Sequence, residues 1–183
     1  GQKFEENVGG KLDAIKGKLT GLAAGLSVGL VSRQLAVVAN ATADYADEVD
    51  RMSLISGIAR DDVSTLGFSF RQNKAELSTL NAVVRTLPKM MQDASKGVAT
   101  AVEAFEDMNI PVKTVDGNLR DVLPVLLDIA NFMADAEDQT GALATAQRVL
   151  GGRSIGLKVA MESLAGDGFE RARIEAEKYG AII

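Results

Sequence analysis

Apolar residues recur every three or four positions along much of the chain, which is the spacing of helices with one buried face. The first such stretch extends from about Lys11 to Ile55 and contains no proline. Its steps alternate between three and four residues, a period near 3.5 that is typical of helices packing along a seam. This seam can pack on the same chain or on a second copy, and the period fits both. Its members are Val28, Val31, Leu35, Val38, Thr42, Tyr45, Val49 and Met52.

Before this seam, glycine occupies every fourth position, at Gly17, Gly21, Gly25 and Gly29. Each glycine costs a helix about 1 kcal/mol relative to alanine, so the run needs a packing reason. On a helix this spacing forms one face that lets another backbone approach closely. The uncharged stretch Leu19–Val31 is shorter than the roughly 20 apolar residues of a membrane span. Two interpretations therefore stay open, a helix tightly packed on a neighbour and a latent membrane-inserting segment.

Capping residues and prolines divide the next part of the chain into further helices. The residues Arg60-Asp61-Asp62 offer helix-capping side chains and predict the start of a short helix that reaches Leu66. Asn73 and Glu76 have the spacing of a capping box. They predict the start of a helix that Pro88 should kink or split. The inward face of that helix is predicted to consist of Leu77, Leu80, Val84, Leu87 and Met91.

A stretch rich in β-branched residues interrupts the helices near residues 110–119. Pro111 favours an extended backbone, and Asp116-Gly117 is a strong hairpin-turn signal. We expect a small two-stranded β-hairpin here. Asp121 should then cap a helix that tolerates Pro124 in its first turn. The inward residues predicted for this helix are Val122, Leu126, Ile129 and Met133.

Three more helices complete the pattern. One is predicted over residues 141–150, the next is capped by Ser154, and a charged last helix ends at Tyr179-Gly180. The chain is thus predicted to be mainly all-α. A long Gly-rich heptad helix over residues 1–56 precedes a multi-helix domain over residues 57–183, in which the β-hairpin is the one excursion.

Composition supports a folded helical protein and excludes much catalytic chemistry. Of 183 residues, 46% are hydrophobic and 25% charged, which is too apolar for a disordered chain. Aromatic residues make up only 4%, which favours helices packed through small side chains. The absence of His and Cys excludes a Ser-His-Asp triad, a Cys-His dyad, thiolate or imidazole metal sites and disulfides. A net charge of -5 gives no general attraction to nucleic acid. Because the chain opens with Gly and not Met, we expect a fragment or a processed product.

Three sequence features come near to ligand-binding or catalytic motifs, but the spacing of their residues does not fit such a function. Gly151–Lys158 comes nearest to a phosphate loop, but Leu157 stands where the lysine is required. Asp116–Asp121 suggests a calcium loop, but Arg120 occupies a ligand position and no Glu follows at position twelve. Adjacent acids such as Asp61-Asp62 point apart on a helix, so a solvated surface is expected. The sequence therefore predicts no enzyme and no catalytic, cofactor-binding or metal-binding residues.

Several segments between Met52 and Gly180 together resemble the tail tape measure proteins of long-tailed bacteriophages and prophages. They are Met-Ser-Leu-Ile-Ser-Gly-Ile from Met52, Ala-Phe-Glu-Asp-Met-Asn-Ile-Pro-Val from Ala104, Asp-Gly-Asn-Leu-Arg-Asp from Asp116, Leu-Leu-Asp-Ile-Ala from Leu126, and Gly-Gly-Arg-Ser-Ile-Gly-Leu from Gly151. The likeness covers about two-thirds of the chain and is most specific between Phe105 and Leu157. It departs at Asn109, where the family often has Gly, and at Ile155, which separates Ser154 from the glycine of the family's turn.

The resemblance implies a structural role and no active site in this region. Tape measure proteins line the tail tube, template tube polymerisation, set tail length and leave ahead of the DNA. The implied partners are copies of the chain, as a trimer or hexamer, and the tail tube, tail tip or baseplate and tail chaperone proteins. The implied location is the virion tail, assembled in the host cytoplasm, with the host envelope reached during infection. As one helix the chain would span only about 270 Å, so a module of a longer ruler is expected.

The leading hypothesis is therefore a tape measure protein that scaffolds the tail. The alternative is a membrane-active helical protein that assembles through its glycine face into a genome-delivery channel or pore. Neither involves specific nucleic-acid binding. Under both hypotheses the residues predicted to mediate helix packing or oligomerisation are Gly17, Gly21, Gly25, Gly29, Val31, Leu35, Val38, Tyr45, Val49 and Met52.

Overall fold

The computed structural model describes residues 44–151 and 155–182. Contacts divide the chain into two compact units, Gly1–Tyr45 and Ala46–Ile183. We call Ala46–Ile183 the second unit. It includes the last helical turns before Gly57 as well as the predicted multi-helix domain.

The described residues are mainly helical, as predicted, and none of them forms a strand. Helical residues 44–56 end just before Gly57, close to the predicted position. The helices that follow are α3 (Arg60–Gln72), α4 (Leu77–Ser95), α5 (Ala99–Asp107), α6 (Val122–Asp135), α7 (Gln139–Leu150), α8 (Ile155–Glu162) and α9 (Gly168–Lys178).

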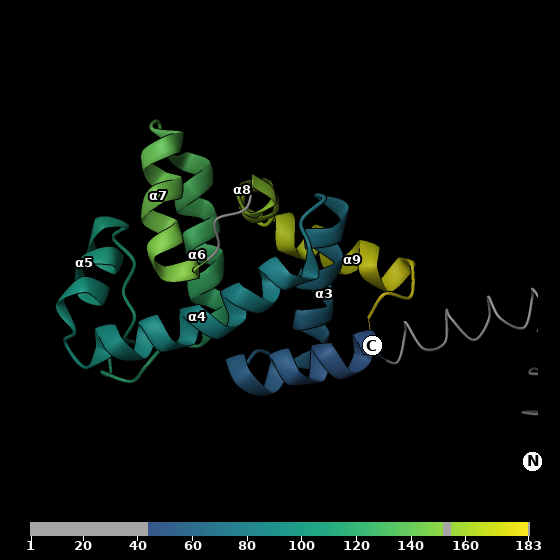
Figure 1. Ribbon diagram of the computed structural model, residues 1–183, viewed down its shortest axis with the longest axis horizontal. Coiled ribbons are helices and arrows are strands. Elements are labelled where there is room, and N and C mark those ends of the chain that lie inside the picture. The colour runs from purple at the N-terminus through teal and green to yellow at the C-terminus, as the bar shows by residue number, and fades with distance from the viewer. Residues whose placement is uncertain (1–43, 152–154, 183) are drawn as a thin grey trace, which may run out of the picture. The chain divides into compact units, whose positions relative to one another are not determined.

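Helix α4 is the centre of the second unit, because it packs against α3, α5, α6 and α7. Figure 1 shows α6 and α7 side by side above α4, with α5 beside them. At the other end of α4, helix α3 packs mainly on α9, and α8 lies between α3 and α6. Helix α4 thus joins α3, α5, α6 and α7, whereas α8 and α9 attach to the unit through α3 and α6.

The core consists mainly of aliphatic side chains and methionines, as the shortage of aromatic residues implies, with a few buried phenylalanines. Full burial of one such side chain stabilises the fold by about 1.5–3 kcal/mol. Val49 and Met52, the last two members of the predicted seam, are both fully buried. The largest fully buried side chains are Phe70, Met52, Leu66, Leu80, Leu87, Met91, Leu126, Ile129, Met133, Leu150, Leu157 and Met161.

The predicted capping box at Asn73 and Glu76 is wrong. Helix α3 continues past Leu66 to Gln72, and Asn73 ends it. The Asn73 side-chain amide donates to the Ser69 carbonyl (2.8 Å) and to Ser163 Oγ (2.9 Å). Asn73 therefore ends α3 and joins it to the turn after α8, and it does not cap α4.

Pro88 does not split α4, which continues from Leu77 to Ser95 as one helix. A proline inside a helix removes a hydrogen bond and costs about 3 kcal/mol or more. Leu87 and Met91, which flank Pro88, are fully buried against the neighbouring helices. This burial offsets the local cost and keeps the two halves of α4 continuous.

The later helix boundaries agree closely with those predicted. Helix α6 begins after Asp121 and holds Pro124 in its first turn, although the Asp121 side chain makes no capping hydrogen bond. Helix α7 ends at Gly151, whose φ of 70° is the left-handed conformation that glycine adopts at little cost. Ser154, the predicted cap of α8, lies outside the described residues.

Candidate functional site

Most of the predicted packing residues lie outside the part of the chain that the structure describes. These are Gly17, Gly21, Gly25, Gly29, Val31, Leu35 and Val38. Tyr45 is half-buried in helical residues 44–56. Val49 and Met52 are buried within the second unit, so the end of the seam packs on its own chain. Oligomerisation through the earlier part of the seam stays a prediction.

Residues 44–151 and 155–182 contain neither a cluster of metal ligands nor a membrane-spanning helix. No three acidic side chains gather there in a way that could hold a metal ion. Among the helices of these same residues, none is both long and apolar enough to cross a membrane.

A polar cluster lies where α3, α8 and α9 meet. Ser163 Oγ donates to the Ala160 carbonyl (2.7 Å) and accepts from Asn73 (2.9 Å). Because the Ser163 hydrogen is used in this way, the Ser69 hydroxyl donates to Ser163 Oγ (3.1 Å). A serine becomes a nucleophile when a base removes its proton, and no base contacts either hydroxyl here. The cluster therefore joins helices and has no catalytic arrangement.

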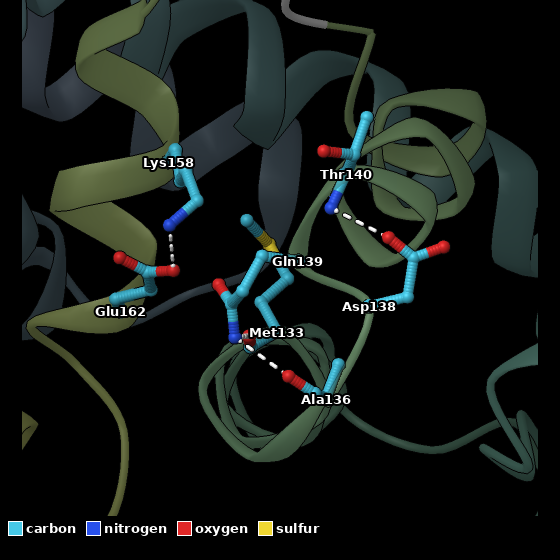
Figure 2. A network of polar contacts seen from close by, with 7 residues as sticks. All are labelled: Met133, Ala136, Asp138, Gln139, Thr140, Lys158 and Glu162. Carbon is cyan, nitrogen blue, oxygen red and sulfur yellow. Dashed lines mark hydrogen bonds and ion pairs between the residues drawn. The ribbon is translucent and has the colours of Figure 1, made fainter.

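A second polar network connects α6 with α7 (Figure 2). The Gln139 side-chain amide donates hydrogen bonds to two carbonyl groups at the C-terminal end of α6, those of Met133 (3.2 Å) and Ala136 (2.8 Å). Asp138 Oδ1 accepts from the backbone N–H groups of Thr140 (3.1 Å) and Gly141 (3.0 Å), and so caps α7. These bonds satisfy helix ends that would otherwise lack partners. This network too is structural.

Asp62 is the one titratable group of the described residues with a clearly shifted pKa. Partial burial raises the pKa of this carboxylate above its usual range. The Arg173 guanidinium acts in the opposite direction, and the carboxylates of Asp61 and Glu170 add to the rise. Ionisation of Asp62 therefore makes the folded state less stable at neutral pH than it would be with a neutral side chain at this position.

Replacing this carboxylate by its neutral isostere should stabilise the protein at pH 7. A group whose folded-state pKa is raised destabilises the fold once it ionises, so its cost appears as the pH rises from the usual Asp range to the raised value. We expect Asp62→Asn to gain less than about 1 kcal/mol at pH 7, because the group stays partly hydrated.

Urea denaturation of both proteins between pH 3 and pH 8 measures the gain from Asp62→Asn. The difference should vanish at the acid end. A gain for Asp62→Asn that is equally large at pH 3 would show that charge is not its cause.

The chain between α5 and α6 forms a tight turn over residues 112–120. Lys113 and Leu119 make one isolated antiparallel bridge. The Thr114 N–H donates to the Asn118 carbonyl (2.8 Å), and Gly117, with φ of 82°, closes a three-residue loop. The pairing is shorter than the two strands predicted. Pro111 has no N–H to extend it, and α6 begins directly after the turn.

Arg120 fastens this turn at its base. Its guanidinium donates to the Pro111 carbonyl and to Asp128 Oδ2 of α6, both at 2.7 Å. Its backbone N–H donates to the Val112 carbonyl (2.9 Å). The sequence indicated the turn through Asp116-Gly117, but the link between Arg120 and Asp128 was missed. The available signal was the spacing of the two residues: Arg120 lies just before a predicted helix, and Asp128 lies about two turns into that helix.

The tip of the 112–120 turn has no packing role in the second unit. Val115 is 104% exposed, and Leu119 is also exposed. Before the turn lies a shallow groove lined by Phe105, Glu106, Asn109, Ile110 and Pro111. Exposed apolar side chains beside a mostly apolar groove form a surface of the kind that contacts between proteins use. We take this surface as the candidate functional site.

Comparisons with protein-family models, with curated proteins and with solved structures found no match to this chain.

Proposed function

We propose that the chain is a module of a structural phage-tail protein, a tape measure that scaffolds tail-tube assembly and sets tail length before leaving ahead of the genome. The segment from Phe105 to Leu157, which resembles this family most, carries the proposal. Among its described residues, Asp116–Asp121 forms a turn and a helix start. A motif whose residues shape the backbone fits a scaffold better than a catalyst.

Two positions within this segment support the resemblance on physical grounds. Asn109, where the family often has Gly, has φ of 54°, a left-handed conformation that Asn and Gly both tolerate. Gly156, the glycine of the family's turn, faces Ala75. A Cβ atom at Gly156 would lie 2.9 Å from the Ala75 Cα atom, closer than real Cβ contacts. The departure at Asn109 therefore keeps the backbone geometry, and Gly156 has a packing reason.

The proposed partners are copies of the chain, the tail tube, the tail tip or baseplate and the tail chaperones, and the proposed location is the virion tail. A ruler of this kind works because an α-helix rises about 1.5 Å per residue, so its length follows the number of residues. In this proposal the second unit supplies contacts, and helical segments elsewhere in a longer polypeptide supply length.

An in-frame deletion in the native phage tests the proposal. Removing 20 residues from a helical segment of the parent polypeptide, outside residues 44–183, should shorten the tail by about 30 Å. Tail lengths are measured by electron microscopy, and mass spectrometry of purified tails checks that the chain is present. The matched control replaces the same 20 residues by an equally long helical sequence and should leave the length unchanged. Full-length tails from the deletion would contradict the proposal.

The glycines at every fourth position favour a second candidate, a membrane-active protein that assembles through its glycine face. The two candidates differ in what happens to Leu19–Val31 when the full chain meets lipid. A membrane-active chain gains protection from protease in this segment on addition of liposomes. Cleavage there at an unchanged rate would exclude the membrane candidate and leave the tail proposal intact.

A further inference from the structure

Helix α9 has little apolar attachment to the rest of the second unit. Of its side chains, only those of Phe169 and Ala176 are buried. Ile174, the one large aliphatic residue of the helix, is 58% exposed, and Tyr179, just after the helix, is 68% exposed. Because burial of apolar side chains supplies most of the packing energy between helices, few contacts of this kind hold α9 in place.

The arginines of α9 make their ion pairs within the helix and the residue before it. Arg171 pairs with Asp167, which precedes the helix (3.1 Å). Arg173 lies between Glu170 (3.9 Å) and Glu177 (3.8 Å). Pairs at these spacings stabilise the helix in which they lie. They stay in place when α9 leaves α3, so they do not oppose its opening.

A polar hollow of about 330 Å³ lies between α3 and α9. Ser69 and Gln72 of α3 and Arg171 and Glu175 of α9 are among its lining residues. The Gln72 side-chain amide donates to Glu175 Oε2 (3.1 Å), and this bond is exposed. An exposed hydrogen bond contributes little to stability, because water replaces it when it breaks. Part of the surface between the two helices is therefore polar and open to water.

The turn before α9 is fixed on one side and has a hinge on the other. The Gly166 N–H donates to Asn131 Oδ1 of α6 (2.7 Å), and Leu164 is buried, so the end of α8 stays attached. Gly166 has φ of 60°, and nothing lies within 4 Å of an added Cβ atom. Because glycine changes its backbone angles at little cost, α9 can move about residues 166–168 while α8 stays in place.

We propose that α9 is a hinged arm that opens from α3 as one unit while the rest of the second unit stays folded. Opening exposes Phe169 and Ala176, together with the side of α3 that carries Ser69 and Gln72. Segments with few buried apolar contacts open before the rest of a domain does. Helix α4, by contrast, packs against four other helices. The proposal does not rest on the proposed tail function.

Single cysteines measure this opening, because the chain itself contains no Cys. Ala176 in α9, Ala146 in α7 and Ala160 in α8 are all 0% exposed, so they form a matched set. Each is replaced by Cys in a separate variant of the full chain, and a thiol reagent is added under native conditions. We expect Ala176→Cys to be labelled at least about tenfold faster than Ala146→Cys and Ala160→Cys, because local opening is enough to expose it.

Amide hydrogen exchange of the unsubstituted chain provides a second measure, which no substitution disturbs. Relative to their rates in an unfolded chain, the amides of α9 should exchange at least about tenfold faster than those of α4. Their exchange should also depend only weakly on urea below the unfolding transition, since a local opening exposes little surface. Exchange in α9 that is as slow as in α4 would overturn the proposal, as would equal labelling of the three cysteines.

The aromatic stack at the far end of the arm tests how α9 is held. The rings of Tyr179 and Phe68 stack with their centroids 6.3 Å apart. Tyr179→Ala should therefore speed the labelling of Ala176→Cys about threefold to tenfold, with no change for Ala146→Cys. Tyr179→Phe keeps the ring and is the matched control, which should leave both rates unchanged. An equal rise at both cysteines would mean that α9 opens only when the whole unit unfolds, and would overturn the proposal.

Discussion

Met52→Asp is expected to destabilise the second unit by more than about 4 kcal/mol, a larger loss than we expect from any other single substitution in this protein. Met52 is 0% exposed in helical residues 44–56. A carboxylate at this position would be buried without a partner, and removing it from water costs several kcal/mol in addition to the lost apolar burial. Because domains of this kind are stable by only about 5–15 kcal/mol, a loss of this size removes a large share of the stability. Urea denaturation followed by circular dichroism measures the loss.

Leu54→Asp provides the matched control, two residues later in the same helix. Leu54 is 87% exposed, so the same chemical change should alter stability by no more than about 0.5 kcal/mol. Equal losses in the two variants would contradict the burial of Met52 within its own chain. A Met52→Asp protein that folds normally but loses self-association would mean that this part of the seam faces another copy.

Features that depend on neighbouring residues in the sequence could be predicted. The period of apolar residues placed Val49 and Met52 on a buried face, because a helix face follows from spacing alone. Gly151 ended a helix as expected, because a left-handed residue after a helix favours glycine wherever it occurs. Local chemistry was enough for these cases.

Features set by contacts between distant segments could not be predicted. Asn73 has the spacing of a capping box, but its amide bonds Ser163, 90 residues later in the chain. Pro88 predicted a kink or a split, and α4 is not split there, because the neighbouring helices bury Leu87 and Met91 on either side of it. Nothing close to Asn73 or Pro88 in the sequence indicates these partners, so local rules gave the wrong result there.

The candidate site was predicted in part. Asp116-Gly117 located the turn, because a glycine in a left-handed conformation is a local requirement of such loops. The single bridge between Lys113 and Leu119 could not be predicted, since it follows from which residues bond across the turn. The predicted packing residues from Gly17 to Val38 lie outside the described residues.

Gly168→Ala is expected to cost the protein about 2–3 kcal/mol, the second largest effect, by displacing the start of α9. A Cβ atom at Gly168 would lie 2.9 Å from the carbonyl carbon of Ser163 and closer still to its oxygen. These are backbone atoms, and the Ser163 side chain is hydrogen-bonded to Ser69 of α3 and to Asn73 just after it, so the neighbour cannot give way easily. Forcing an extra methyl into such a contact typically costs about 1–3 kcal/mol.

Gly166→Ala is the control for this change, because it lies in the same turn. Gly166 has φ of 60° but nothing within 4 Å of the added Cβ atom, so its cost comes from backbone conformation alone, about 1 kcal/mol. Urea denaturation gives both losses, and amide hydrogen exchange shows whether α9 opens. Only Gly168→Ala should speed exchange throughout α9, since few of its side chains are buried and Phe169 and Ala176 supply most of its attachment. If the two variants lose the same stability and α9 stays protected in both, close backbone approach does not hold this helix.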